Sequence, residues 1–207
     1  MSRSYGQYCG LARALDVIGD RWNLLIVRQL LVAPARYRDL LDGLAGVATN
    51  LLSDRLRDLE AAGVVERRLA DEGNAVIYAL TAWGAQLREP IEGLIRWSAP
   101  LMVRGPAEDR FRPEWLAVAL PALLGSRVKT DRSATVGVAI DGQLFQVQVT
   151  GKGLDASPHD GRALDAVVRA EAAIVLGLAA GMLDFDEIRP LVEVEGDETA
   201  LRAIFGA

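Results

Sequence analysis

The chain has 207 residues, of which 51% are hydrophobic and 25% are charged. This length suits two small domains, and the composition excludes a disordered chain. The net charge of -5 comes entirely from the second half, because residues 1–103 contain as many arginines as acidic residues and no lysine. Phosphate contacts act locally, so an acidic total does not exclude nucleic-acid binding by the first half.

Cys9 and His159 are the single cysteine and the single histidine of the sequence. They exclude an internal disulfide and a His/Cys metal cage, and we expect neither a metal nor a cofactor. No apolar run reaches the roughly 20 residues of a membrane span. The first ten residues lack the apolar region of a secretory signal. We therefore expect a cytoplasmic protein that does not contact the membrane.

Apolar periodicity in the first half predicts four helices. They cover residues 11–18, the segment between Asp20 and Pro34, residues 37–44 and residues 49–62, with Gly63 closing the last. Strands over 64–69 and 75–80 flank a turn at 70–74. This is the order of a winged helix-turn-helix, in which one helix enters the major groove and the hairpin wing lies along phosphates or in the minor groove.

Polar side chains on the 49–62 helix and arginines around it are the candidate DNA contacts. Leu51, Leu52, Leu56 and Leu59 are expected to bury the opposite face of that helix. Base-edge contacts call for hydrogen-bonding side chains, and phosphate contacts call for arginine. The candidates are Arg36, Tyr37, Thr49, Asn50, Ser53, Arg57, Arg67 and Arg68. The alternative for the arginines is a solvated surface that pairs with Glu66, Asp39 or Asp71.

Asp54 and Arg55 are charged residues on the same helix that are not among the candidate DNA contacts. Asp54 must accept from a base amine, pair with Arg57 or Arg55, or point away from phosphate. Arg55 alternates with buried leucines and is interpreted as a structural brace, ranked below Arg57 as a DNA contact.

Thr81 is expected to cap a final long helix of the first half, which Pro90 should kink or break. Its apolar stripe needs a partner surface. The simplest partner is the same helix of a second copy, which would place two recognition helices roughly 34 Å apart on pseudo-palindromic double-stranded DNA.

Several segments in the first hundred residues resemble the HxlR-type regulators, relatives of the MarR group. They are residues 8–10, 14–22, 24–28, 36–40, 50–56, 59–65, 78–81 and 90–97. The resemblance implies a homodimeric transcription factor, held together through the first and last helices of this domain. Ala48 departs from the pattern, since a capping serine is frequent there, so either Thr49 caps the recognition helix or the helix starts later.

Cys9 lies just before the first helix, where the resemblance implies a cysteine that senses oxidants in some members. Such a sensor needs exposure and a lowered thiol pKa, and Arg13 offers a nearby positive charge. The alternative is a cysteine buried as a small apolar residue.

The second half predicts a small α+β domain with an antiparallel sheet, which together with the mainly α winged helix gives the fold class. We place the winged-helix and dimerisation domain at 1–105, a linker at 106–113 and the α+β domain at 114–207. Strands over 134–140 and 144–150 flank Asp141-Gly142, a strong hairpin signal. A helix over 115–124 is expected to be interrupted or bent at Pro121. Further elements are expected at 164–169, 171–180, 185–188, 191–194 and 197–205.

The closing strand and helix of the second half weakly resemble sterol-carrier-protein-like domains. That resemblance implies a tunnel for an apolar small-molecule effector. The alternative is an ordinary core filled by residues such as Trp115, Phe145, Ile174 and Phe205. No ligand-binding residue is assigned.

Three functional hypotheses remain open. The first is a sequence-specific transcriptional regulator, a repressor that acts as a homodimer. The second is an apolar-ligand sensor or carrier in which the winged helix is mainly a dimerisation scaffold, and the third is a module that docks a basic protein. An enzyme is not expected, because Ser157, His159 and Asp160 lie in a loop without a nucleophile motif or a phosphate-binding loop.

Overall fold

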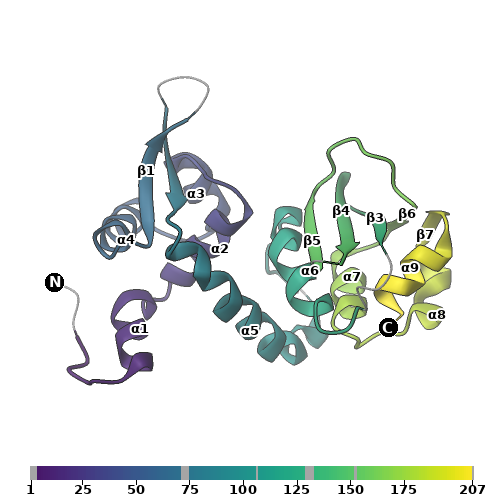
Figure 1. The fold of residues 1–207 in the computed structure, drawn as a ribbon, viewed down its shortest axis with the longest axis horizontal. Helices are drawn as coiled ribbons and strands as arrows, with labels where there is room; N and C mark the ends of the chain where they lie inside the picture. Colours follow the sequence, from purple (N-terminus) through teal and green to yellow (C-terminus); the bar gives the residue numbers. More distant parts are fainter. Residues whose placement is uncertain (1–3, 71–74, 106, 129–132, 152, 207) are drawn as a thin grey trace. The chain divides into compact units, whose positions relative to one another are not determined.

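The computed structural model describes residues 4–70, 75–105, 107–128, 133–151 and 153–206, and it divides the chain into two compact units. They comprise Met1–Ile91 and Glu92–Ala207 (Figure 1). The division falls inside a helix that the sequence analysis assigned to the first domain, because Ile95 and Ala99 pack against the core of the second unit. The functional boundary near residue 105 stays a prediction.

The first unit has the predicted order of helices and hairpin. Its elements are α1 (Gly10–Ile18), α2 (Asn23–Val32), α3 (Tyr37–Gly43), α4 (Thr49–Ala61), β1 (Val65–Leu69), β2 (Val76–Leu80) and the 3-10 turn η1 (Gly84–Leu87). The two strands pair antiparallel, from Val65 opposite Leu80 to Leu69 opposite Val76. Most of the predicted turn at 70–74 lies outside the described residues.

The core of the first unit forms around α2, as its nearly continuous apolar sequence predicts. Ile26 and Val27 are fully buried. The inner side of α4 is formed by Leu52, Leu56 and Leu59, whereas Leu51 is only half-buried. The three inner leucines fix which side of α4 faces solvent.

Both ends of α4 follow from local backbone chemistry. The helix begins at Thr49, as the predicted range 49–62 has it. Ala48 is the N-cap and no side chain caps the helix, so neither alternative for the missing serine, a Thr49 cap or a later start, is correct. At the other end Gly63 has φ of 76°, its N–H donates to Glu60, and the N–H of Val64 donates to Leu59. This is a Schellman motif, which confirms Gly63 as the residue that closes the helix.

The predicted long helix after Thr81 is divided differently from the expectation. The Thr81 hydroxyl accepts from the N–H of Gly84 at 3.0 Å and so caps η1. Helix α5 (Arg88–Ser98) then begins just before Pro90 and continues into η2 (Ala99–Arg104). Pro90 lies in the first turn of α5, where its missing N–H has no helical partner to lose, so it does not break the helix.

The second unit combines one mixed sheet with short helices. It contains η3 (Pro113–Trp115), α6 (Leu116–Leu124), β3 (Ala134–Ile140), β4 (Gln143–Thr150), β5 (Gly153–Pro158), β6 (Ala166–Arg169), α7 (Ala172–Ala179), α8 (Phe185–Ile188), η4 (Arg189–Leu191), β7 (Glu193–Gly196) and α9 (Glu198–Phe205). The strand order is β5-β4-β3-β6-β7, with β3 parallel to β6 and the other neighbours antiparallel.

The hairpin of β3 and β4 forms as predicted. Asp141 and Gly142 both have positive φ, of 49° and 76°, which is the backbone of a two-residue type I′ turn. Helix α6 continues through Pro121 and is not interrupted there. Strand β5 was not predicted, and the strand expected at 191–194 begins only at Glu193.

Candidate nucleic-acid interface

Four of the predicted DNA-contacting residues share the outer side of α4. Thr49, Asn50 and Arg57 are exposed and Ser53 is half-buried. Their spacing places them within about 100° of arc around the helix. Asn50 and Arg57 lie roughly opposite the buried leucines, and Thr49 and Ser53 lie toward one edge of the buried side. The structure therefore presents a continuous polar strip from the first turn of α4 to its middle.

Tyr37 ties α3 to the beginning of α4. Its hydroxyl donates to the backbone carbonyl of Thr49 at 2.7 Å and accepts from the Ser53 hydroxyl at 3.2 Å. Both Tyr37 and Ser53 were predicted to contact DNA, but their polar atoms are engaged with each other and with the helix backbone. The arrangement makes Tyr37 a residue that positions the recognition helix.

The arginines of α4 and the hairpin are each paired with a carboxylate. Arg57 pairs with Asp54 three residues earlier, which answers the question that the sequence left open for Asp54. Arg67 Nε donates to Glu60 Oε1 at 2.8 Å. Glu60 raises the pKa of the Arg67 guanidinium through this hydrogen bond and through its charge.

Two more arginines of the predicted set lie at the edges of this surface. Arg68 Nε lies 3.3 Å from Glu66 Oε1, and about half of each side chain is exposed. Arg36 is exposed at the N-cap of α3, where its backbone N–H donates to Asp39 Oδ2 at 3.0 Å. An exposed pair such as that of Arg68 and Glu66 contributes little to stability, so a phosphate oxygen can replace the Glu66 carboxylate.

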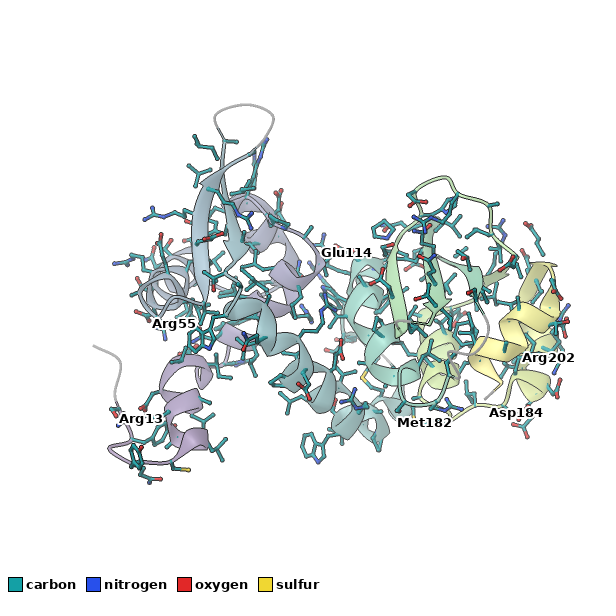
Figure 2. The ribbon with its side chains drawn as sticks, viewed as in Figure 1. Arg13, Arg55, Glu114, Met182, Asp184 and Arg202 are labelled. Atoms are coloured by element: carbon teal, nitrogen blue, oxygen red, sulfur yellow. The ribbon has the colours of Figure 1, made fainter. Side chains whose placement is uncertain are left out.

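Arg55, labelled in Figure 2, joins α4 to the segment before α2. Its guanidinium lies 2.9 Å from Asp20 and 3.3 Å from Asp58. These contacts fit its interpretation as a brace. The sequence offered little guide to them, because Asp20 lies 35 positions away.

Comparison with known proteins addresses this first unit. Residues 17–105 match the family described as HxlR-like helix-turn-helix. YodB, an HTH-type transcriptional regulator of Bacillus subtilis, is 31% identical over 86 residues, which are 41% of this chain and 77% of YodB. The chain belongs to the HxlR-like helix-turn-helix family. It is thus a DNA-binding transcriptional regulator of HxlR type, and that family is not one of enzymes.

Two further similarities extend the comparison. An uncharacterized HTH-type regulator of Synechocystis, sll1512, is 34% identical over 84 residues, which are 40% of this chain and 62% of that protein. Among solved structures, PA1607, a putative transcription factor, is 34% identical with a TM-score of 0.46, over 52% of this chain and 74% of that one. The family match ends at residue 105, so most of the second unit lies beyond it.

Cys9 of this HxlR-type regulator is exposed at the N-cap of α1. The backbone N–H groups of Ala12 and Leu11 lower the pKa of its thiol. Arg13, which the sequence suggested as the source of positive charge, instead lies 3.5 Å from Asp16. The start of a helix, where N–H groups are free to meet a thiolate, explains the shift.

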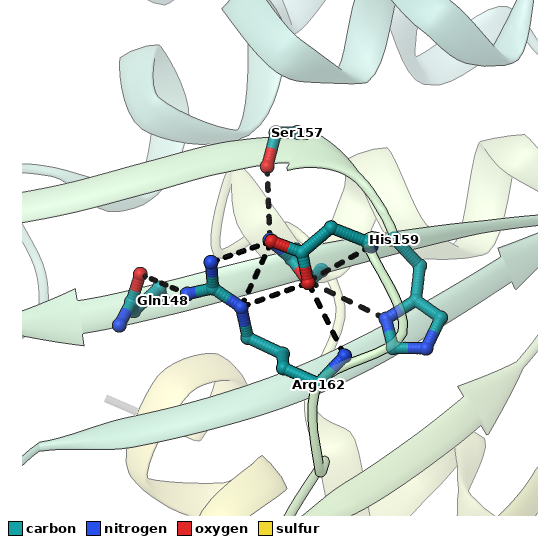
Figure 3. A network of polar contacts seen from close by, with 6 residues as sticks. Gln148, Ser157, His159 and Arg162 are labelled. Atoms are coloured by element: carbon teal, nitrogen blue, oxygen red, sulfur yellow. Dashed lines mark hydrogen bonds and ion pairs between the residues drawn. The ribbon is translucent and has the colours of Figure 1, made fainter.

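The Ser157, His159 and Asp160 segment forms a structural network without a catalytic arrangement (Figure 3). The Gln146 amide donates to the Ser157 hydroxyl at 3.2 Å, and His159 Nδ1 lies 3.4 Å from the other end of that amide. Arg162 clamps Asp160 and lowers the pKa of its carboxyl. Gln146 therefore stands where a serine nucleophile would need its histidine.

In residues 4–70, 75–105, 107–128, 133–151 and 153–206, no three His, Cys, Asp or Glu side chains come together as a metal site. Within the same ranges every helix is too short or too polar to cross a bilayer.

Proposed function

We propose that the chain is a repressor that binds a pseudo-palindromic operator as a homodimer, with α4 in the major groove and the β1–β2 hairpin along the phosphates. The observation that carries this proposal is the exposed polar strip on α4, with Asn50 in its first turn. Asparagine can make paired hydrogen bonds to adenine, and recognition helices approach base edges with their N-terminal residues. Such a regulator acts in the cytoplasm.

The roles of the other residues follow from their contacts. Arg67 and Arg68 hold the DNA backbone from the hairpin, and Arg36 does so from the start of α3. Arg57 exchanges Asp54 for a phosphate, since an exposed ion pair costs little to break. Tyr37 and Ser53 act mainly by holding the first turn of α4 in place.

Exposed apolar residues support the dimer. Leu11 and Leu15 on α1 are 69% and 39% exposed. Leu94, Trp97 and Leu101, in α5 and η2, are 47%, 76% and 72% exposed. Both are stripes at helical spacing, and covering them with a second copy removes apolar surface from water. The dimer therefore uses the first and last helices of the predicted domain 1–105.

Selection of bound sequences from a random DNA pool tests the proposal. The full chain should enrich a palindromic consensus with two half-sites. Enrichment of a single half-site would contradict the dimer, and no enrichment would contradict sequence-specific binding. The same selection with Asn50→Ala should relax the consensus at one position of each half-site.

For Cys9 we propose a second role, oxidant sensing. Its exposure and the lowered thiol pKa favour this role, because the thiolate is the reactive form.

For the second unit we propose sensing or assembly. Phe145, Phe185 and Phe205 are almost completely buried in its core. This packing favours the ordinary-core interpretation over a sterol-carrier-like tunnel for an apolar effector.

A further inference from the structure

A cavity of about 690 Å³ lies in the first unit between α1 and the segment around η1. Its walls include Ala14 and Val17 from α1, Trp83 and Leu87 from the other side, and Val64 from the joint between α4 and β1. The volume falls in the range of pockets that bind small organic molecules. None of these residues was singled out as a ligand contact by the sequence.

The side of α1 that lines the cavity differs from the side proposed for the dimer. The α1 residues that line it are Gly10, Arg13, Ala14, Asp16, Val17 and Ile18. At about 100° per residue they cover roughly half of the helix circumference. The exposed Leu11 and Leu15 are not part of the lining. A second copy can therefore cover the outward leucines of α1 without filling the cavity. On α5 the two surfaces adjoin, because the lining residue Pro90 lies four residues before Leu94 on the side that carries the dimer stripe.

The lining favours an uncharged aromatic ligand. Most of the walls are apolar, and the Trp83 side chain, 54% exposed, offers a ring face for stacking. The charged lining residues are Arg13, labelled in Figure 2, and Asp16. They form an ion pair with Arg13 Nη1 3.5 Å from Asp16 Oδ2. Because their charges cancel, neither a cation nor an anion is preferred.

Asp16 also holds the chain that precedes α1. Its carboxylate accepts from the Ser4 hydroxyl at 3.0 Å and from the N–H of Tyr5 at 2.8 Å. These bonds and Arg13 engage the carboxylate, so it is a poor partner for a cationic ligand. The Gln86 side chain supplies an amide for one polar substituent.

The cavity floor includes the joint that connects α4 to the hairpin. Thr81 bridges this joint, because its N–H donates to Val64 at 3.1 Å and its hydroxyl donates to Gly63 at 2.7 Å. Trp83 lies two residues after Thr81 in the chain. A molecule held between α1 and the joint thus contacts Val64, the residue that lies between the end of α4 and the first strand of the wing.

We propose that this cavity binds a small uncharged aromatic molecule and that its occupancy changes the affinity of the regulator for DNA. A ligand that fits one arrangement of α1 on the joint better than another shifts the population between them. The second half of the proposal rests on the DNA-binding function proposed above.

The fluorescent probe N-phenylnaphthylamine, which is uncharged and aromatic, tests binding directly on the full chain. We expect saturable binding of one probe per protomer. Ala14→Trp should fill the cavity and raise the probe Kd at least about tenfold. Ala85→Trp is the matched control, because Ala85 is exposed on η1 outside the lining, and it should leave the Kd unchanged. Trp83→Ala provides a second cavity variant that removes the stacking surface.

Sedimentation velocity of the same proteins separates a ligand site from an interface. Wild-type dimers that bind the probe support the proposal. Probe binding only after dilution to monomers, with Ala14→Trp monomeric, would show that a second copy fills the cavity and would overturn it. Equal probe binding by the wild type and both cavity variants would also overturn it.

A DNA titration with and without the probe tests the regulatory step. The probe should change the DNA Kd of the wild type and of Ala85→Trp but not that of Ala14→Trp. Probe binding with an unchanged DNA Kd would overturn regulation alone. Failure of every protein to bind selected DNA, with probe binding intact, would instead overturn the proposed function.

Discussion

Arg67 on the first strand of the hairpin donates a hydrogen bond to Glu60 on the recognition helix, with Nε and Oε1 2.8 Å apart. The bond joins the two parts of the molecule that a winged helix uses on DNA. Glu60 can act on Arg67 in two ways: it orients the guanidinium toward DNA, and it partly neutralises the charge that is proposed to meet a phosphate. Substitutions at Arg67 and at Glu60 separate these two effects.

Arg67→Ala should weaken binding to all DNA sequences alike, because a phosphate contact carries no sequence information. The slope of log Kd against log salt should fall by up to about 0.9 for this one contact. Fluorescence anisotropy over a salt series measures the slope. An unchanged slope would remove Arg67 from the interface.

Glu60→Gln should tighten binding to all sequences, because it removes a negative charge beside Arg67 and keeps a hydrogen-bond acceptor. Glu66→Gln, beside Arg68, should tighten binding to all sequences for the same reason, because Arg68 is also proposed to meet a phosphate. If Glu60→Gln weakens binding instead, Glu60 acts mainly by orienting Arg67.

Tyr37→Phe removes the hydroxyl between Thr49 and Ser53. We expect a loss of about 1 kcal/mol in the free energy of unfolding, the usual contribution of such a hydrogen bond. DNA affinity should also fall for all sequences while the salt slope stays constant, because no phosphate contact is lost. Urea unfolding and anisotropy measure the two effects. A reduced salt slope would show that the hydroxyl contacts phosphate directly.

Asn50→Ala should cost about 1–3 kcal/mol of binding free energy on the selected sequence and little on unrelated DNA. The reason is that Asn50 is exposed in the first turn of α4 and is proposed to read a base edge. Competition titrations with the selected duplex and a scrambled duplex give the difference. Equal losses on both duplexes would assign Asn50 to the backbone.

Cys9 should react with iodoacetamide at lower pH than the same cysteine in the unfolded chain. The backbone N–H groups at the start of α1 lower its pKa, so the thiolate persists as the pH falls. Rates of alkylation against pH give the midpoint, and Arg13→Ala should not move it. A folded midpoint at or above the unfolded one would contradict the proposed sensor.

Asp160→Asn should reduce the acid sensitivity of the second unit. Arg162 lowers the pKa of the Asp160 carboxyl in the folded state. The carboxylate therefore contributes stability above the unfolded pKa of about 4 and loses it as the pH falls toward the lower folded pKa. Urea unfolding at several acidic pH values should show a flatter pH dependence in the variant. An identical pH dependence would show that the ion pair does not contribute.

The elements of the first unit could be predicted because their signals are local. Gly63 closes α4 because glycine readily adopts a positive φ. In the second unit, Asp141-Gly142 forms the hairpin turn because both residues adopt a positive φ there. Strand β5 could not be found this way. It lies at the sheet edge, where Gly153 and Pro158 are tolerated although both residues disfavour a central strand.

The polar strip on α4 was predictable, but the contacts that organise it were only partly so. The buried leucines of α4 imply an outer side, so Asn50 and Arg57 follow from helical periodicity. The bond between Tyr37 and Thr49 depends on how α3 packs on α4, and the bond between Glu60 and Arg67 depends on the path through Gly63. Such contacts between elements leave no periodic signal in the sequence.

In the proposed dimer, two copies place α4 in successive major grooves of one operator. Methylation interference on the selected duplex tests it, because methylation of guanine N7 blocks the major groove. Two symmetric clusters of interfering guanines are expected, with their centres about 10 base pairs apart. A single cluster, or no interference in the major groove, would contradict it.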